Sequence, residues 1–266
     1  MKISLIIPTY KPQDYLWECL DSVKNQTFSK KDFELILVLN GCNEPYYTQI
    51  KAYIEANLND LEVNFIQTDQ GGVSNARNKA LDCIKGEYVA FLDDDDYISP
   101  TYLSQLYLQS APNVVSLCYP LAFQDGQSVT YPYSITKQYD CLAHKGNVSF
   151  HKARKFFNGP VYKLIHRDII GDRRFNPAFK NGEDSLFMFL ISDRMKEVRF
   201  TDKSAIYYRR IRLGSATTVN RDRKSVIMNL LRMMKEYSHI YFSGMERYSL
   251  SFYITRMLGA LRSMMQ

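Results

Sequence analysis

Short apolar runs alternate with amphipathic segments over residues 2–92, and this alternation constrains the fold more than any other feature of the chain. The runs 2–8 and 33–39 are rich in Ile, Leu and Val and end in turn residues, which is typical of strands buried on both faces. In chain order the predicted elements are strand 2–8, helix 13–26, strand 33–39, helix 46–58, strand 62–67, helix 73–84 and strand 88–92. This order predicts an α/β fold with a mostly parallel central sheet and helices on both faces.

The second half of the chain has a weaker pattern. Ser99 and Pro100 are a helix cap followed by proline in the first turn, and they predict a helix to about Gln109. Further predictions are a strand at 113–119, an irregular or mobile segment at 120–158, a helix that follows Asp184 and includes 187–191, and a strand at 205–211. Two helices, at about 222–242 and 247–264, are predicted at the end.

Length and composition fit a globular chain with one large domain and an appendage. We expect the domain at 1–218 and a C-terminal helical extension at 219–266.

The five cysteines include no CxxC pair, so neither a disulfide framework nor a zinc site is indicated, and a reducing, cytoplasmic location is expected. The apolar run 3–7 is too short for a signal peptide, and no run approaches the ~18 apolar residues of a membrane span.

Charge is distributed unevenly along the chain. Residues 1–193 carry 19 basic and 23 acidic side chains, whereas residues 194–266 carry 15 basic and 5 acidic side chains. A basic tail is compatible with a nucleic-acid arm, a contact with anionic lipid or a clamp on an anionic substrate. No aromatic-basic RNA motif or zinc-knuckle spacing supports the first of these, so no nucleic-acid partner is expected.

Four consecutive aspartates, at 93–96, follow the strand predicted at 88–92. Because the carboxyl ends of parallel strands meet at one edge of a sheet, the loops that begin at Thr9, Asn40 and Thr68 should converge there with the acids. Like charges this close raise one another's pKa unless a cation or donors intervene. A divalent cation with a bound diphosphate would satisfy them, and a solvated acidic turn is the alternative. A phosphatase of the haloacid dehalogenase type would need a DxDGT-like turn, which this sequence lacks.

A glycine pair at 71–72 follows the third predicted strand and opens a helix that carries Arg77. Glycines allow close backbone approach, free amides at a helix start attract anions, and an arginine adds a donor fork. Taken alone, this pattern favours a phosphate site no more strongly than an ion pair between Arg77 and a carboxylate.

Four motifs stand in an order and spacing that closely resemble family 2 glycosyltransferases. They are Pro8-Thr9-Tyr10, the run GGVSNARN at 71–78, the run FLDDDD at 91–96 and Gly182-Glu183-Asp184. The resemblance covers about residues 2–215 and implies the GT-A fold, with a nucleotide-binding half at about 1–98 and an acceptor half at about 99–218. It also implies sugar transfer from a nucleotide diphosphate to a glycan or lipid-linked glycan, with inversion, in bacterial polysaccharide biosynthesis.

By the same resemblance, Asp93 and Asp95 are the ends of a DxD motif, with Asp93 near the ribose and Asp95 on a Mn²⁺ or Mg²⁺ ion. Asp184 is the expected catalytic base, which removes the proton of an acceptor hydroxyl as that oxygen attacks the anomeric carbon opposite the diphosphate. Glu183 is expected beside the diphosphate or the acceptor. Without the other motifs, Glu183 and Asp184 would be interpreted as acids that favour a helix N-terminus.

The other nucleotide contacts that the resemblance implies are Pro8, Thr9, Tyr10, Arg77 and Asp94. The chain departs from the family after the second strand, where an aspartate that binds uracil is common and this sequence has Asn40. An asparagine can donate and accept at a base edge but has no charge. A UDP-sugar is the expected donor.

Arg209, Arg210 and Arg212 lie in a segment that often closes over the diphosphate in the family, and arginines suit that role. A basic surface strand is the alternative. His166 and Lys163 lie where related enzymes often place acceptor-site residues, although a lone histidine is more often structural.

Met228, Leu231, Met234 and Tyr237 could form a helix face that lies in a lipid interface. Packing of this helix onto the catalytic domain is the preferred interpretation, with a basic face left for peripheral membrane contact at the cytoplasmic side. The alternative to an enzyme is a noncatalytic nucleotide-sugar-binding or scaffold protein with the same fold.

Overall fold

The first part of the chain folds as the predicted alternation of strands and helices. The elements are β1 (Ile3–Thr9), α1 (Tyr15–Lys24), β2 (Phe33–Asn40), α2 (Tyr46–Asn57), β3 (Glu62–Thr68), α3 (Val73–Leu81) and β4 (Tyr88–Phe91). The computed structural model describes residues 1–145, 148–212 and 222–265. Every residue of β1, β2 and β4 is buried, which explains why their sequences are continuous apolar runs.

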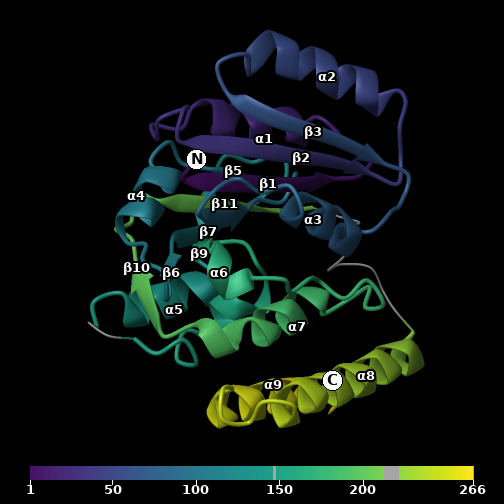
Figure 1. Ribbon diagram of the computed structural model, residues 1–266, viewed down its shortest axis with the longest axis vertical. Coiled ribbons are helices and arrows are strands. Elements are labelled where there is room, and N and C mark those ends of the chain that lie inside the picture. The colour runs from purple at the N-terminus through teal and green to yellow at the C-terminus, as the bar shows by residue number, and fades with distance from the viewer. Residues whose placement is uncertain (146–147, 213–221, 266) are drawn as a thin grey trace.

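The main sheet has seven strands in the order β10-β6-β9-β4-β1-β2-β3. The three strands from later in the chain are β6 (Val114–Leu117), β9 (Lys163–His166) and β10 (Glu197–Phe200). All pairs are parallel except those of β9, which runs antiparallel to β4 and β6. Helix α3 covers one face of the sheet and α1 the other (Figure 1). The predicted α/β fold with a mostly parallel sheet is confirmed.

A second, smaller sheet crosses the edge of the main sheet where β4 ends. Its strands are β5 (Tyr97–Ile98), β11 (Ile206–Ile211), β7 (Tyr119–Gln124) and β8 (Thr130–Tyr131), in the order β5-β11-β7-β8. Tyr207 on β11 pairs with Ile98 on β5, just after the four aspartates. This pairing brings the arginines of β11 beside the acidic loop.

The prediction of an irregular or mobile segment at 120–158 is wrong for most of its length. The segment contains most of β7, all of β8, helix α5 (Ser134–Leu142) and the 3-10 helix η1 (Arg154–Asn158). The predicted strand at 113–119 is in fact two strands, β6 and β7, that join different sheets. Aromatic packing from distant elements holds α5: the Tyr139 ring contacts those of Tyr119 and Phe200 at centroid distances of 4.9 and 5.3 Å. A local period cannot reveal such contacts.

The remaining helices include α4 (Tyr102–Leu108), which confirms the helix predicted after Ser99, and α6 (Arg167–Ile170). Helix α7 (Glu183–Leu190) starts at the acidic pair, and η2 (Ser192–Arg194) follows it. None of the helices in the described ranges is long and apolar enough to cross a membrane.

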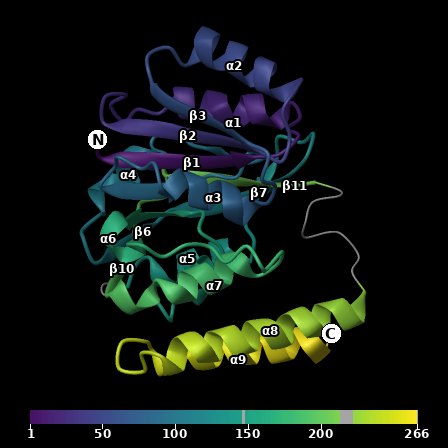
Figure 2. The same ribbon diagram turned by 45° about the vertical axis from the view of Figure 1, so that its right-hand side comes forward.

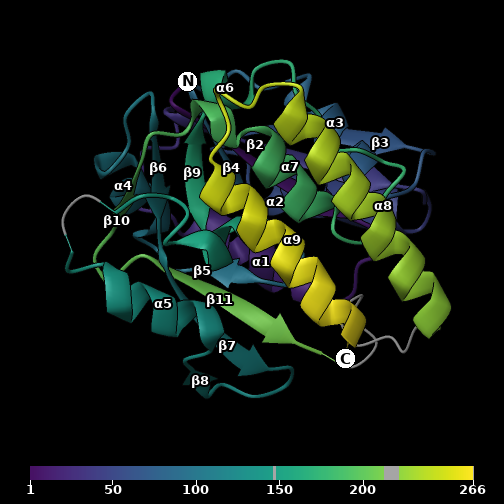
Figure 3. The ribbon, with the colours of Figure 1, turned by 90° about the horizontal axis from the view of Figure 1, so that it is seen from below.

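The described chain ends in a hairpin of two helices, α8 (Arg223–Phe242) and α9 (Leu250–Met265). The hairpin packs beneath α7, away from the main sheet (Figures 2 and 3). The Phe189 ring of α7 contacts those of Tyr237 and Phe252 at 5.3 and 5.6 Å. The hairpin therefore packs on the domain, as preferred from the sequence. The four residues expected to share a lipid-facing side do not, because Tyr237 is buried while Met228 and Leu231 are exposed.

Candidate active site

A cavity of about 1230 Å³ lies at the carboxyl ends of β1 and β2. It is the place where the acidic loop after β4, the glycine loop before α3, the start of α7 and the arginines of β11 meet. All but two of the candidate site residues named from the sequence line it: Pro8, Thr9, Tyr10, Asn40, Arg77, Asp93, Asp94, Asp95, Glu183, Asp184, Arg209, Arg210 and Arg212. Parallel strand topology explains the convergence, because their carboxyl ends share one edge.

Arg77 on α3 joins the acidic loop to the predicted base. Its side chain is 3% exposed, and its Nη2 lies 2.9 Å from Asp93 Oδ1 while its Nη1 lies 2.5 Å from Asp184 Oδ1. Burial opposes the charge on the guanidinium, but the carboxylates of Asp184 and Asp93 outweigh it and raise the pKa of Arg77. Arg77 therefore stays charged and holds two carboxylates from distant parts of the chain on one cavity.

Asp184 lies in the first turn of α7, after a glycine in the left-handed region (Gly182, φ 84°). The positive φ favours glycine there, and the end of the Met233 side chain of α8 packs against the position that a Cβ would take. Burial raises the pKa of Asp184, and this outweighs the opposing effect of Arg77. Arg77 binds Oδ1, and among the described residues no hydrogen-bond donor reaches Oδ2.

Glu183, the neighbour of Asp184, is buried, and its Oε2 has no hydrogen-bond partner within the described ranges. Burial raises its pKa, and the charge of Asp184 adds to this effect. The charge of Arg77 opposes the rise for both carboxyls, but only Asp184 binds the guanidinium directly.

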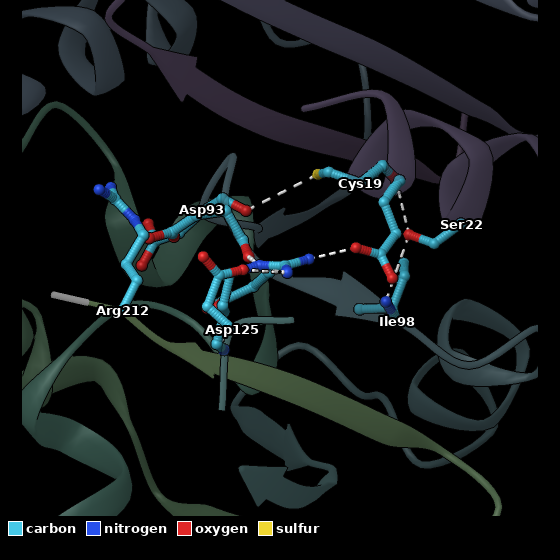
Figure 4. A network of polar contacts seen from close by, with 10 residues as sticks. Cys19, Ser22, Asp93, Ile98, Asp125 and Arg212 are labelled. Atoms are coloured by element: carbon cyan, nitrogen blue, oxygen red, sulfur yellow. Dashed lines mark hydrogen bonds and ion pairs between the residues drawn. The ribbon is translucent and has the colours of Figure 1, made fainter. Parts of the chain in front are cut away.

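The four aspartates of the acidic loop have different surroundings. Burial raises the pKa of Asp94 to about 7, although the Thr9 hydroxyl donates to its Oδ2 at 2.5 Å and opposes the shift. Burial and the charge of Asp93 raise the pKa of Asp95, whose Oδ2 lies 2.7 Å from Arg212 Nε. Figure 4 shows Arg212 and Asp125 around this loop and the Cys19 thiol donating to the Asp93 carbonyl at 3.7 Å.

Asp96 has a structural function that the sequence did not indicate. It is buried, its Oδ2 accepts from the Tyr207 hydroxyl at 2.7 Å, and its Oδ1 accepts from the Arg210 amide at 2.7 Å. The Tyr207 hydroxyl also accepts from the Asp93 amide at 3.3 Å. Asp96 and Tyr207 therefore tie β11 to the acidic loop. The sequence did not identify Tyr207 as a site residue, because a buried aromatic residue on a strand is usually part of the hydrophobic core.

The three arginines of β11 are not equivalent. Arg210 pairs with Glu18 and, at 2.8 Å, with Asp125, so it holds α1 and β7 to β11. Arg212 pairs with Asp95, and in the described part of the chain no carboxylate pairs with Arg209. Arg209 and Arg212 are thus the two that are placed to meet an anionic ligand. Residues 213–215, the rest of the predicted diphosphate segment, lie outside the described residues.

Asn40 holds the glycine loop. Its Nδ2 donates to the Thr9 carbonyl at 2.7 Å, and its Oδ1 accepts from the Gly72 amide at 2.9 Å. Gly41 has a φ of 63°, and a Cβ on it would lie only 2.8 Å from the Gly71 Cα. Asn40 therefore positions the turn that leads into α3, while its predicted contact with the nucleotide base stays a prediction.

His166 and Lys163 are the two candidate residues that do not line the cavity. His166 pairs with Tyr88 at the amino end of β4, whereas the acidic loop follows the carboxyl end. Its Nδ1 accepts from the Asp168 amide at 3.2 Å, and its ring packs edge-on against Tyr88. The prediction of a diphosphate or acceptor role for His166 is not supported, because β9 runs antiparallel to β4 and carries this residue away from the site.

Lys163, from the same strand, is fully buried and supports the site indirectly. Its Nζ donates to the carbonyls of Gly159 and Val161 at 2.5 and 2.6 Å, and burial lowers its pKa to about 7. Gly159 faces Asp184 Oδ2. The cavity also includes polar residues that the sequence did not indicate, among them Asn158 at the end of η1 and Lys180 and Asn181 in the loop before α7. Isolated polar residues have no periodic pattern that could have revealed them.

The acidic loop can supply oxygen ligands for a metal ion. Within the described residues there is no group of three or more His, Cys, Asp or Glu side chains arranged to hold one. A hard cation bound to a diphosphate needs only one or two protein carboxylates. Asp93 and Asp95 each have one oxygen on an arginine and one without a described partner, so this donor set fits Mn²⁺ or Mg²⁺.

Comparison with known proteins agrees with this arrangement. The model of "Glycosyl transferase family 2" matches residues 4–173, and the chain belongs to this family. "Glycosyltransferase GlyA" of Streptococcus pneumoniae serotype 4 is 30% identical over 235 residues, which cover 82% of this chain and 32% of GlyA. The chain spans about a third of the length of such curated relatives.

Solved structures confirm the GT-A fold. Staphylococcus aureus TarS 1–349 in complex with UDP-GlcNAc aligns with a TM-score of 0.69 at 23% identity, covering 100% of this chain and 81% of that one. The mannosyltransferase PcManGT of Pyrobaculum calidifontis, in complex with GDP-Man and Mn²⁺, aligns with a TM-score of 0.66 at 16% identity, covering 97% and 68%.

Proposed function

We propose that this protein is an inverting, metal-assisted glycosyltransferase that moves a sugar from a nucleotide diphosphate to a hydroxyl of a glycan or lipid-linked glycan in polysaccharide biosynthesis. The observation that carries the proposal is the bridge of Arg77, which holds Asp93 of the acidic loop and Asp184 of α7 on one cavity. Family membership supports it. A UDP-sugar is the preferred donor, since the TarS structure was solved with UDP-GlcNAc.

The nucleotide would bind over the ends of β1 and β2. Tyr10 is 52% exposed on the cavity and offers a ring on which a base can stack, next to Pro8 and Thr9. Arg77, Asp93 and Asp94 lie on the ribose and phosphate side. We propose a nucleotide-binding half at about 1–98 and an acceptor half at about 99–218; the boundary at 218 lies outside the described residues.

Asp95, with Asp93, would hold the Mn²⁺ or Mg²⁺ ion. When bound, such an ion neutralises charge that develops on the leaving diphosphate. Arg209 and Arg212 would add two fixed positive charges on the same side, and planar guanidinium groups suit phosphate oxygens. Because Arg212 binds Asp95 in this structure, it would exchange that carboxylate for the diphosphate when the ligand enters.

Asp184 would act as the general base through Oδ2. The acceptor oxygen forms its bond to the anomeric carbon as the bond from that carbon to the diphosphate breaks, and the hydroxyl proton passes to Oδ2. Arg77 on Oδ1 orients the carboxylate, and its positive charge favours the ionised form that a base requires. Attack from the face opposite the leaving group inverts the configuration. Glu183, buried behind Asp184, would help to position the acceptor side of the loop.

A thermal-shift screen tests the donor site. UDP, GDP, CDP and dTDP are compared, each with and without Mn²⁺, on the wild type and on Asp95→Ala. The proposal expects stabilisation by one nucleotide, UDP, that requires Mn²⁺ and is absent in Asp95→Ala. If the wild type binds no nucleotide, or if Asp95→Ala binds as well as the wild type, the assignment of this cavity as the donor site is wrong.

We propose a cytoplasmic location, at the membrane face where a lipid-linked acceptor would be available. Within the described residues all five cysteines are free thiols, which suits a reducing compartment.

The alternative function is that of a noncatalytic nucleotide-sugar-binding protein. Such a protein would use the same donor cavity but would have no need for an ionised base at Asp184.

A further inference from the structure

Exposed apolar side chains gather on the outer face of the C-terminal hairpin. On α9, Leu250, Ile254, Leu258 and Leu261 are all exposed, and on α8 Met228 and Leu231 are exposed. Phe242 at the end of α8 and Met245 in the turn after it are exposed as well. In the described chain outside the hairpin, the exposed large apolar side chains are those of Met1, Tyr10, Leu108 and Val129, which lie far apart in the sequence. Exposed apolar side chains that gather on one part of a protein indicate an interaction site.

The spacing places the α9 residues on one side of the helix. Positions 250, 254, 258 and 261 follow the i, i+4, i+8, i+11 pattern, whereas Phe252 and Ala260 point into the protein and are buried. We name these four residues, together with Met228 and Leu231 of α8, the outer face. Figure 3 shows α8 and α9 side by side at this end of the molecule, with the rest of the chain behind them.

The charge around the outer face suits an anionic surface. Residues 222–265 carry seven basic and three acidic side chains. On α8, Lys224 and Lys235 are exposed and share the side of Met228 and Leu231, because positions 224, 228, 231 and 235 follow helical spacing. A partly apolar helix face flanked by lysines is the composition that lies in the interface of anionic bilayers.

The hairpin also forms part of the rim of the cavity. Val226 of α8 lines the cavity, and Asn229 Nδ2 donates to the Asn181 carbonyl of the cavity wall at 3.0 Å. We propose that the outer face docks onto an anionic lipid bilayer and thereby holds the mouth of the cavity beside the membrane. The docking is inferred from the exposed residues of the hairpin alone. Its purpose, the delivery of a lipid-linked acceptor to the cavity, rests on the proposed function.

Vesicle flotation of the full chain tests the docking. Vesicles of phosphatidylcholine alone are compared with vesicles that contain phosphatidylcholine and phosphatidylglycerol at about two to one. The wild type should bind the mixed vesicles, and the double variant Ile254→Ser/Leu258→Ser should bind them about tenfold more weakly or worse. The double variant Lys224→Glu/Lys235→Glu should bind the mixed vesicles about fivefold more weakly for each lysine replaced. Its binding to vesicles of phosphatidylcholine alone should equal that of the wild type.

The matched control is Leu108→Ser/Val129→Ser, which removes two apolar side chains that are 70% and 71% exposed but lie outside the hairpin. It should bind vesicles like the wild type. Equal binding by the control and the Ile254→Ser/Leu258→Ser variant would overturn the proposal. So would sedimentation showing a wild-type dimer that this variant converts to a monomer without loss of vesicle binding, since the face would then join two copies.

Turnover on a soluble acceptor, measured without vesicles, separates this proposal from the proposed function. All three double variants should keep that turnover, because none of the changed residues lines the cavity. Transfer without vesicle binding by the wild type would reject the docking and leave the function standing. Vesicle binding without transfer on any acceptor would reject the function and leave the docking standing.

Discussion

The first 98 residues and the C-terminal hairpin both build walls of the same cavity, but they do so by different means. In the first region, Thr9 and Asn40 lie at the carboxyl ends of neighbouring strands. Asn40 forms hydrogen bonds with both Thr9 and Gly72 within this region. The hairpin contributes Val226 directly and otherwise contacts the start of α7, which carries Asp184, and the end of η1. The first 98 residues therefore form much of the proposed donor side without the hairpin, whereas the position of Asp184 depends on contacts from both regions.

The hairpin contacts the start of α7 and the end of η1 through specific side chains. The Tyr237 and Ser185 hydroxyls lie 2.6 Å apart, and the Met233 side chain fills the space beside Gly182. Arg256 of α9 binds Asn158 Oδ1 at 2.6 Å, and Asn158 lines the cavity. From the other side, Arg77 binds Asp184. The comparison teaches that the base is held between two parts of the protein, and each can be weakened separately.

The largest effect is expected for Arg77→Ala, which removes the bridge between the two parts. Two partly buried carboxylates would lose their cation, which should cost about 3 to 5 kcal/mol of stability and about 10³-fold in turnover. The control is Arg174→Ala, whose pair with Asp82 is largely exposed and should contribute less than about 1 kcal/mol. Denaturant unfolding and turnover measure both variants; equal losses would contradict the bridge.

A smaller effect is expected for Asp94→Asn, which tests the acidic loop of the first region alone. Because burial raises the pKa of Asp94 to about 7, the folded protein keeps a proton that the unfolded chain releases above pH ~4. Wild-type stability therefore falls as the pH rises from about 4 to 7, and the Asp94→Asn variant should show no such fall, because an amide does not titrate. The variant should be more stable than the wild type by about 2 kcal/mol at pH 8 and no more stable than the wild type near pH 4.

Scanning calorimetry at the two pH values measures that difference. Asp172→Asn, at an exposed position, serves as the control and should shift stability by less than about 0.5 kcal/mol at either pH. A stability gain by Asp94→Asn that is the same at both pH values would show that protonation of Asp94 is not its cause.

The smallest effect is expected for Tyr237→Phe, which weakens only the hold of the hairpin on α7. Loss of the hydrogen bond to Ser185 should cost about 1 kcal/mol of stability and lower turnover about threefold, with nucleotide binding unchanged. Tyr253→Phe is the matched control, because Tyr253 bonds to Ser238 inside the hairpin at 2.9 Å. It should lose similar stability but no turnover, and a loss of turnover equal to that of Tyr237→Phe would deny the hairpin a specific influence on the site.

The difference between the two regions also explains what could be predicted from the sequence. The strands and motifs of the first region are local patterns, so the sheet edge and the gathering of Asp93, Asn40 and Arg77 there followed from topology. The bonds between Asn229 and Asn181 or between Arg256 and Asn158 join residues far apart in the chain and have no local signal. His166 was misplaced for a related reason, since nothing local showed that β9 runs antiparallel to β4.

The most direct test of the central claim compares turnover and nucleotide binding in Asp184→Asn. The amide keeps the shape of the side chain but cannot take the acceptor proton. We predict that turnover falls at least about 10²-fold while the Kd for the nucleotide with Mn²⁺ stays within about twofold. In the wild type, the rate should also decrease as the pH is lowered through the pKa of Asp184, because the base must be ionised. This decrease should lie above the ordinary aspartate pKa of about 3.9, because burial raises the pKa of Asp184. Full turnover in Asp184→Asn, or an equal loss of nucleotide affinity, would contradict the account.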